Sequence, residues 1–278
     1  MSADDARTLF DLAAAPADLR AALDAYLLAL ADDAFLQGHR DSEWTGLGPI
    51  LEEDIAFSSM AQDEIGHALV WYSLRAEQLG APDPDRQAFR RDAPGWRSAR
   101  LVELPRGDYA HSLVRRTLFD IAKAVQYDAL AQSAWPPLAT AARKLRQEKK
   151  YHLLHNQAYV KRLGTANADA HDRLQAALDA LFPAALGLFE PTEGESRLVE
   201  AGVVPPAARL LELWLGALRP LLDAATLTAP IVADGPAGAP RAAVAAIDGG
   251  RRGQHGADLE ALLADLQALH RSDPEATW

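Results

Sequence analysis

Apolar residues recur every three or four positions over long stretches of this chain, which is the spacing of one face of an α-helix. Runs in which β-branched and polar residues alternate, the pattern of strands, are almost absent. The chain is therefore expected to be all-α. The periodic segments predict four long helices, at about 18–37, 49–79, 108–134 and from Pro137 to Gly164, and shorter ones at about 168–189, 205–226 and 257–270.

Glycine and proline mark the breaks between the long helices. Gly80 and Pro82 end the second helix, and Pro136 separates the third helix from the fourth, which makes those two antiparallel neighbours. Residues 82–107 are rich in proline and arginine and predict a long irregular crossover, with Trp96 at the surface. Two helix hairpins joined by one long connection predict a ferritin-like four-helix bundle.

The domain organisation that we expect is simple. Residues 1–17 form an N-terminal extension, and residues 18–228 form the bundle with its accessory helices. Residues 229–278 form a Gly/Pro-rich loop, a short helix and a tail that belong to the same domain. At 278 residues, 49% of them hydrophobic, the chain can bury one large core.

Composition excludes several classes of function. A net charge of −11 argues against nucleic-acid binding, and the absence of cysteine means that any metal needs carboxylate and imidazole ligands. No apolar run is long enough to span a bilayer and the first residues lack a signal-peptide pattern, so we expect a cytoplasmic protein without membrane contact. The basic run on the fourth helix is expected to be a solvated face, and it consists of Arg143, Lys144, Arg146, Lys149 and Lys150.

Acidic residues and histidines lie on the apolar stripes of the four long helices. Glu64 and His67 form Glu-x-x-His, a spacing that lets one helix offer an oxygen and a nitrogen to the same ion. The other helices contribute, by the same periodicity, Asp33 in preference to Asp32, Asp120, and Glu148 with His152. Four carboxylates and two imidazoles are the ligand inventory of a two-iron site.

Lysines on the same stripes change this interpretation. Lys149 stands three residues before His152, where a second Glu-x-x-His would need a carboxylate, and Lys123 follows Asp120 by about one turn. Their charge could balance the acids in place of metal, so the sequence predicts either a metal-free ionic cluster or one weak site for iron or another divalent ion. The sequence requires no cofactor. The remaining histidines, including His39, His111, His171 and His270, are expected at the surface or at helix caps.

Three segments resemble the ferritin-like subunits of bacterial phenylacetyl-CoA epoxidase, a multicomponent oxygenase. They are AQDEIGHALVWYSLRAEQLG, TLFDIAKAVQYDAL and EKKYHLLHNQAYVKRLG, on the second, third and fourth long helices. In that family the A-type subunit is catalytic and carries two irons, and the C-type subunit is its structural partner.

Features of the sequence are similar to the C type in particular. Glu148 stands four residues before His152, Glu43-Trp44-Thr45-Gly46 follows the first helix, and the chain ends GGRRGQHGADLEALLADLQALHRSDPEATW. That ending contains a glycine-basic loop, a histidine, an amphipathic helix and a final tryptophan, Trp278. Glu-x-x-His at Glu64 and His67 departs from the C type and resembles the A type.

The resemblance implies a complex that epoxidises the aromatic ring of phenylacetyl-CoA with O₂, using electrons from NADPH delivered by a separate reductase subunit. This chain would then be a non-catalytic partner of the A-type subunit, docked through its long helices and surface tryptophans. The alternatives are an active di-iron oxygenase or oxidase in its own right and, with less support, a ferritin-like metal store. Arg251 and Arg252 are candidates for contact with the phosphates of coenzyme A.

Overall fold

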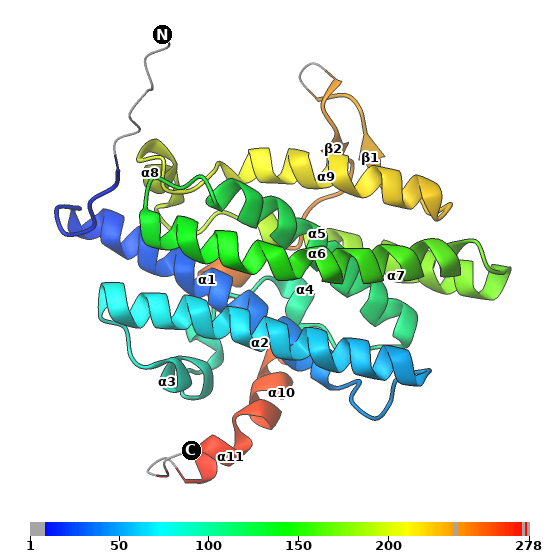
Figure 1. The fold of residues 1–278 in the computed structure, drawn as a ribbon, viewed down its shortest axis with the longest axis horizontal. Helices are drawn as coiled ribbons and strands as arrows, with labels where there is room; N and C mark the ends of the chain where they lie inside the picture. The colour runs from blue at the N-terminus through cyan, green and yellow to red at the C-terminus, as the bar shows by residue number, and fades with distance from the viewer. Residues whose placement is uncertain (1–8, 236–237, 274–275, 277–278) are drawn as a thin grey trace.

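Four long helices form the centre of the protein. The computed structural model describes residues 9–235, 238–273 and 276, so part of the predicted N-terminal extension and Trp278 lie outside the described residues. The central helices are α1 (Ala17–Ser42), α2 (Leu51–Leu79), α5 (Tyr109–Leu130) and α6 (Pro136–Gly164). The all-α prediction is confirmed, as is the order of two helix hairpins joined by a long crossover (Figure 1).

Local sequence explains where these helices begin and end. Gly80 follows α2 with a φ of 72°, a left-handed conformation that glycine adopts at little cost. The side chain of Asp108 accepts a hydrogen bond from the backbone N–H of His111 and so caps the start of α5. Pro136 occupies the first turn of α6, where a missing N–H does no harm.

The first helix is longer than its pattern predicts. The polar residues after Gln37 suggested a turn, but α1 continues to Ser42. One helical turn beyond Gln37, the carboxylate of Asp41 accepts a hydrogen bond from the Gln37 amide at 2.9 Å, and both side chains are buried. The extension therefore brings an additional carboxylate, Asp41, into the interior.

The crossover is partly regular, and several of its side chains are buried in the core. It contains α3 (Pro84–Phe89), the 3₁₀ turn η1 (Ala93–Gly95) and α4 (Arg100–Glu103). The predicted exposure of Trp96 is wrong: its ring is fully buried against Phe35, and the guanidinium of Arg91 lies 4.3 Å from its centroid. Arg91, one of the arginines that made this segment look exposed, thus stacks its guanidinium group on the ring.

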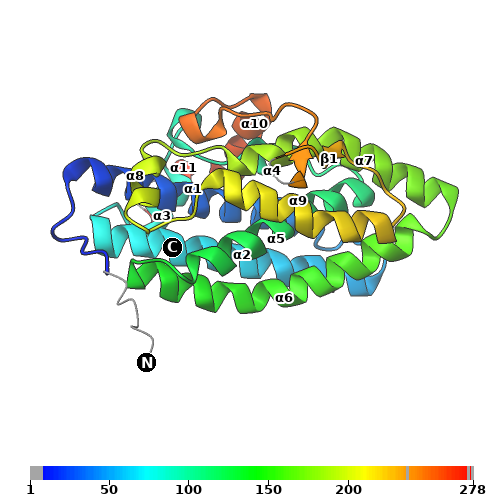
Figure 2. The same ribbon diagram turned by 90° about the horizontal axis from the view of Figure 1, so that it is seen from above.

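Accessory elements cover part of the bundle. They comprise α7 (Ala168–Leu186), η2 (Gly187–Phe189), α8 (Glu195–Glu200), α9 (Ala207–Ala224), the short pair β1 (Ile231–Val232) and β2 (Arg241–Ala242), η4 (Gly250–Arg252), α10 (Ala257–Leu266) and α11 (Ala268–Ser272). Helices α7 and α9 pack against α5, and α8 packs against α1. Figure 2 shows α2 and α6 along one side of the molecule, with α4, α7 and α10 at the opposite side.

The pairs of central helices differ in how closely their backbones approach one another. Helices α1 and α2 are in close backbone contact, and so are α5 and α6, whereas long side chains span the distance between α1 and α5. Gly38 permits the first approach, because a Cβ there would lie 2.9 Å from the carbonyl oxygen of Ala61. In the part of the chain that the structure describes, no helix is long and apolar enough to cross a membrane.

Gly38→Ala is expected to lower the free energy of unfolding by about 1–3 kcal/mol, because the added methyl group would force α1 and α2 apart. Urea denaturation measures the change. Gly216→Ala is the matched control, since Gly216 lies within α9 and a Cβ there meets nothing within 4 Å. An equal effect of both substitutions would contradict this account of the α1–α2 contact.

Candidate functional site

Three helices bring a carboxylate, a second carboxylate and an imidazole together at the bundle centre. Glu64 of α2, Asp120 of α5 and His152 of α6 each place one ligand-type atom within 4.8 Å of the others, and all three side chains are buried. Their stripes face inward, as the helical periodicity predicts. These three residues therefore have the types and the spacing of a partial set of metal ligands.

Lys149 occupies the space between the two carboxylates. Its ammonium group donates a hydrogen bond to Glu64 Oε1 and a second one, at 2.7 Å, to Asp120 Oδ1. The lysine is as deeply buried as its partners. A fixed positive charge thus contacts the oxygen atoms that would have to bind a metal ion.

Arg116 adds a second cation that the sequence analysis missed. Its guanidinium forms ion pairs with Asp41, with Glu64 at 3.1 Å and with Asp120 at 3.1 Å. Arg116 stands four residues before Asp120 on the same helix, and this i, i+4 spacing was the signal that could have found it. We call Asp41, Glu64, Arg116, Asp120 and Lys149 the central cluster, in which two cations face three carboxylates.

Charge within this cluster controls the protonation of its acids. Burial opposes ionisation of Glu64, but Lys149 and His67 outweigh that effect and hold its pKa well below the ordinary value. Arg116 and Lys149 do the same for Asp120 against its own burial, so its pKa is also lowered. Burial dominates at Asp41 and raises its pKa. Glu64 and Asp120 are therefore ionised and held by cations.

The histidines join α2 to α6 along a seam. His67 Nε2 lies 2.6 Å from Glu148 Oε2, His152 Nε2 lies 2.9 Å from Asp63 Oδ2, and His155 Nε2 lies 3.1 Å from Glu53 Oε1. Glu148 is only half-buried, with 40% of its side chain exposed. It therefore lies at the rim of the bundle, bound to His67, and outside the central cluster.

His152 connects this seam to the cluster. The carboxylates of Asp120 and Glu64 raise its pKa above 6.5 although burial lowers it. Its Nδ1 nevertheless lies 2.9 Å from a guanidinium nitrogen of Arg116, which can only donate a hydrogen bond. Because a proton on Nδ1 would oppose that contact, these hydrogen bonds belong to neutral imidazole that donates from Nε2 to Asp63.

Asp33 belongs to a different cluster. Its carboxylate accepts hydrogen bonds from Lys123 at 2.8 Å and from Arg251 at 2.8 Å, and also from the backbone N–H of Ala99. Burial would raise the pKa of Asp33, but Arg251 and Lys123 lower it below the ordinary value. The preference for Asp33 over Asp32 is not supported, because Asp32 is equally buried and accepts from Arg91 and from Tyr72.

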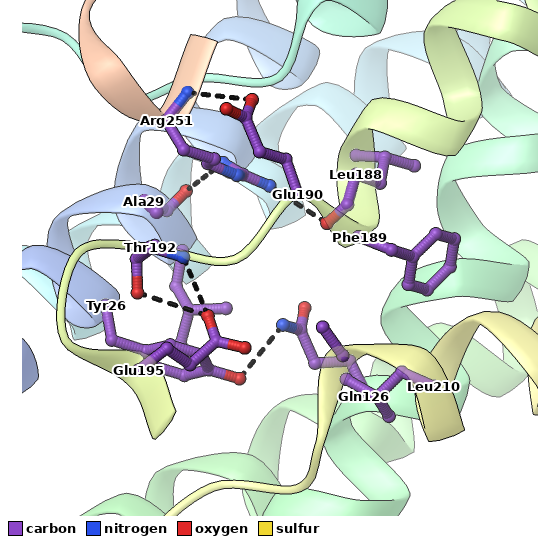
Figure 3. Close-up of a pocket in the computed structure, with 12 residues that line it drawn as sticks. Tyr26, Ala29, Gln126, Leu188, Phe189, Glu190, Thr192, Glu195, Leu210 and Arg251 are labelled. Carbon is purple, nitrogen blue, oxygen red and sulfur yellow. Dashed lines mark hydrogen bonds between the residues drawn. The ribbon is translucent and has the colours of Figure 1, made fainter. Parts of the chain in front are cut away.

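The two arginines predicted to meet coenzyme A have different surroundings. Arg251 is buried and committed to Asp33, whereas 57% of the Arg252 side chain is exposed and its guanidinium pairs with Glu190. Arg251 also borders a small cavity between α1, α5 and η2, which Tyr26, Gln126 and Glu195 line from other sides (Figure 3). At about 20 Å³ this cavity has room for a water molecule and none for an acyl-CoA.

The donor set does not fit a two-iron centre. Lys149 and Arg116 already hold the oxygen atoms that face one another at the centre, and Asp33 is held by two other cations. Glu64 Oε2 and His67 Nδ1, 3.4 Å apart, are buried without a hydrogen-bond partner. These two donors are too few to hold an iron ion, which takes carboxylates and imidazoles from all four helices in di-iron bundles.

Comparison of the sequence with known proteins identifies the family of this chain. The sequence matches the phenylacetic acid catabolic protein family over residues 9–278. The chain belongs to this family. A relative from Escherichia coli (strain K12), the C-type subunit of 1,2-phenylacetyl-CoA epoxidase, is 30% identical over 256 residues, which are 92% of this chain and 99% of that protein. The family resemblance inferred from the helix segments is thereby confirmed for the phenylacetic acid catabolic proteins.

Lys149→Met is expected to lower the free energy of unfolding by about 3–5 kcal/mol, because it leaves two buried carboxylates with Arg116 alone. Urea denaturation measures the loss. Lys150→Met is the matched control, since Lys150 is exposed and donates a hydrogen bond to Gln147 in its own helix. This substitution should change stability by less than about 0.5 kcal/mol. Wild-type stability in the Lys149 variant would refute the central role of this ammonium group.

The stability difference between wild type and Lys149→Met is expected to depend on pH. Glu64 and Asp120 have pKa values of 4.5 and 3.8 when unperturbed, and the fold lowers both. Their ionised forms therefore stabilise wild type above about pH 5, and this stabilisation is lost as the pH falls toward the folded-state values. The difference should narrow on acidification in a urea series between pH 7 and 3, while that between wild type and Lys150→Met stays flat.

Proposed function

We propose that this chain is the structural, non-catalytic subunit of a 1,2-phenylacetyl-CoA epoxidase and that it pairs with a di-iron A-type subunit. The family assignment and the C-type relative support the complex. The observation that carries the structural role is Lys149, whose ammonium group lies between Glu64 and Asp120, where a metal ion would need negative charge. The chain keeps the bundle and replaces the charge of metal with its own cations.

The alternative is a catalytic subunit with a di-iron site of its own. The pair Glu64 and His67 favours it, because it retains the Glu-x-x-His spacing and two buried atoms without hydrogen-bond partners. Against it stand Lys149 and Arg116, whose cationic groups contact the carboxylate oxygens of Glu64 and Asp120 that a metal ion would need. A metal store is the weakest alternative, since the same cations exclude metal from the centre.

The contact with coenzyme A is retained as a proposal for Arg252 alone. The two terminal nitrogens of the Arg251 guanidinium already donate to Asp33 and to the backbone carbonyls of Ala29 and Leu188. Arg252 is exposed and could exchange Glu190 for a phosphate.

Reconstitution of the epoxidase separates these roles. The A-type subunit, the reductase and the other subunits are combined with wild-type chain or with His67→Ala, and phenylacetyl-CoA consumption is measured per assembled complex. A structural role predicts that His67→Ala retains turnover within about two-fold, because the substitution removes no catalytic group. His171→Ala, on the exposed side of α7, controls for the loss of a histidine.

Iron analysis of the same samples gives an independent result. We expect about two irons for each pair of A-type subunit and this chain, and none bound by this chain when it is purified alone. Iron bound stoichiometrically by the isolated chain, together with loss of turnover in His67→Ala, would establish the catalytic alternative.

A further inference from the structure

Buried side chains enclose a small cavity where the accessory helices meet the bundle. Helices α7 and α9 each contact both α5 and α6, and the cavity lies between these four helices (Figures 1 and 2). Each lining residue is at most 5% exposed, so the wall separates the cavity from solvent. The lining residues are Val114, Thr117, Leu118, Val160, Leu178, Leu218, Leu221, Leu222 and Leu227. We call this space the α5–α9 cavity.

The wall of the cavity is apolar almost throughout. Every lining residue except Thr117 is a leucine or a valine, and Thr117 donates its hydroxyl proton to the carbonyl oxygen of Leu113 at 2.7 Å. A buried water molecule needs roughly two to four polar partners, whereas the side chains of this wall offer one hydroxyl oxygen. The chemistry of the wall therefore disfavours water and favours a non-polar guest.

The volume of the cavity limits the size of that guest. It measures about 10 Å³, which is close to the least space that holds one water-sized molecule. A diatomic gas such as dioxygen is about as wide as a water molecule, whereas an aromatic ring or an acyl chain is far larger. Size and polarity together select a small non-polar gas.

Helix α9 is the wall that is best suited to admit such a gas. Leu218, Leu221 and Leu222 line the cavity, and the exposed Pro220 lies between them inside the helix. Proline has no N–H, so the carbonyl of Gly216 lacks the hydrogen bond that it would accept in a regular helix. A helix with one hydrogen bond fewer opens locally at lower cost, which favours the entry of a small molecule.

We propose that the α5–α9 cavity is a reversible binding site for dioxygen. The gas is held by dispersion contacts with the aliphatic wall, and no hydrogen bond or metal ion takes part. Size and polarity select the class of gas, whereas the choice of dioxygen within that class rests on the proposed function, because an epoxidase that uses O₂ must take it up. The cavity shares no residue with the central cluster and raises the local concentration of dissolved gas without reacting with it.

The test is NMR spectroscopy of the full-length chain, with isotope-labelled leucine and valine methyl groups, under oxygen pressure. Dissolved dioxygen is paramagnetic and speeds the relaxation of methyl groups that it contacts. The methyl groups of Leu118, Val160 and Leu222 are expected to relax at least about five-fold faster than those of Leu23 and Leu27. These two leucines of α1 are equally buried but do not line the cavity.

Substitution of a valine in the wall locates the effect. Val160→Ile adds a methyl group to the cavity wall and should bring the relaxation of Leu118 to within about two-fold of that of Leu23. Val244→Ile is the matched control, because Val244 is exposed and lies outside the cavity, and it should leave the fast relaxation unchanged. Thermal unfolding checks that the variants are folded, and Val114→Ile replaces Val160→Ile if the latter is not.

The result that would overturn the site is relaxation of the cavity methyl groups no faster than that of Leu23. Fast relaxation that persists in both Val160→Ile and Val114→Ile would also overturn it, since the gas would then bind elsewhere. Nuclear Overhauser contacts between these methyl groups and water would show a hydrated cavity and would have the same consequence. None of these outcomes bears on the epoxidase role, which fails independently if the chain does not support turnover on reconstitution.

Discussion

Carboxylates in the interior of a helical bundle must be neutralised where water does not reach, and the centre of this protein is arranged around that requirement. Glu64 and Asp120 lie on facing helices, and two cations hold them there. Lys149 and Arg116 come from α6 and α5, so each ion pair also fixes the position of one helix relative to another. The ion pairs that stabilise the buried carboxylates therefore also set the geometry of the bundle.

The ammonium and guanidinium groups at the centre differ from a metal ion in the chemistry that they permit. In carboxylate bundles a metal ion supplies charge and open coordination positions at which oxygen can react. An ammonium or guanidinium group supplies the charge and the hydrogen bonds but offers no such position. A bundle stabilised in this way keeps its shape without dependence on metal supply, which agrees with the structural role proposed above.

Helical periodicity was sufficient to predict the four long helices, the hairpin order, and the meeting of Glu64, Asp120, His152 and Lys149. Periodicity did not predict the contacts of residues that lie beyond the expected helix end or far apart in the sequence. Asp41 was missed because polar residues after Gln37 suggested a helix end, and its partner Arg116 was missed with it. Asp33 was assigned to the wrong neighbours, because its partner Arg251 is 218 positions away and no local pattern connects them.

The types of residue exposed at the surface differ from the prediction. Tryptophans were expected to form the docking surface, yet all five in the described part of the chain are buried, namely Trp44, Trp71, Trp96, Trp135 and Trp214. Aliphatic residues of α2 and α6 are exposed instead. Aromatic rings bury the most area per side chain and fill the spaces between layers, so residue type alone does not locate an interface.

The pairing of Arg251 with Asp33 has a consequence for how this protein is made. Helix α1 leaves the ribosome early, but one of the cations that neutralise its buried carboxylate is encoded more than 200 residues later. Until that arginine emerges, α1 carries Asp33 with Lys123 as its only charged partner in the central helices. Contacts of such long sequence separation form late. The ion pair between Asp33 and Arg251 therefore cannot form until residue 251 has been synthesised, which is after all four central helices.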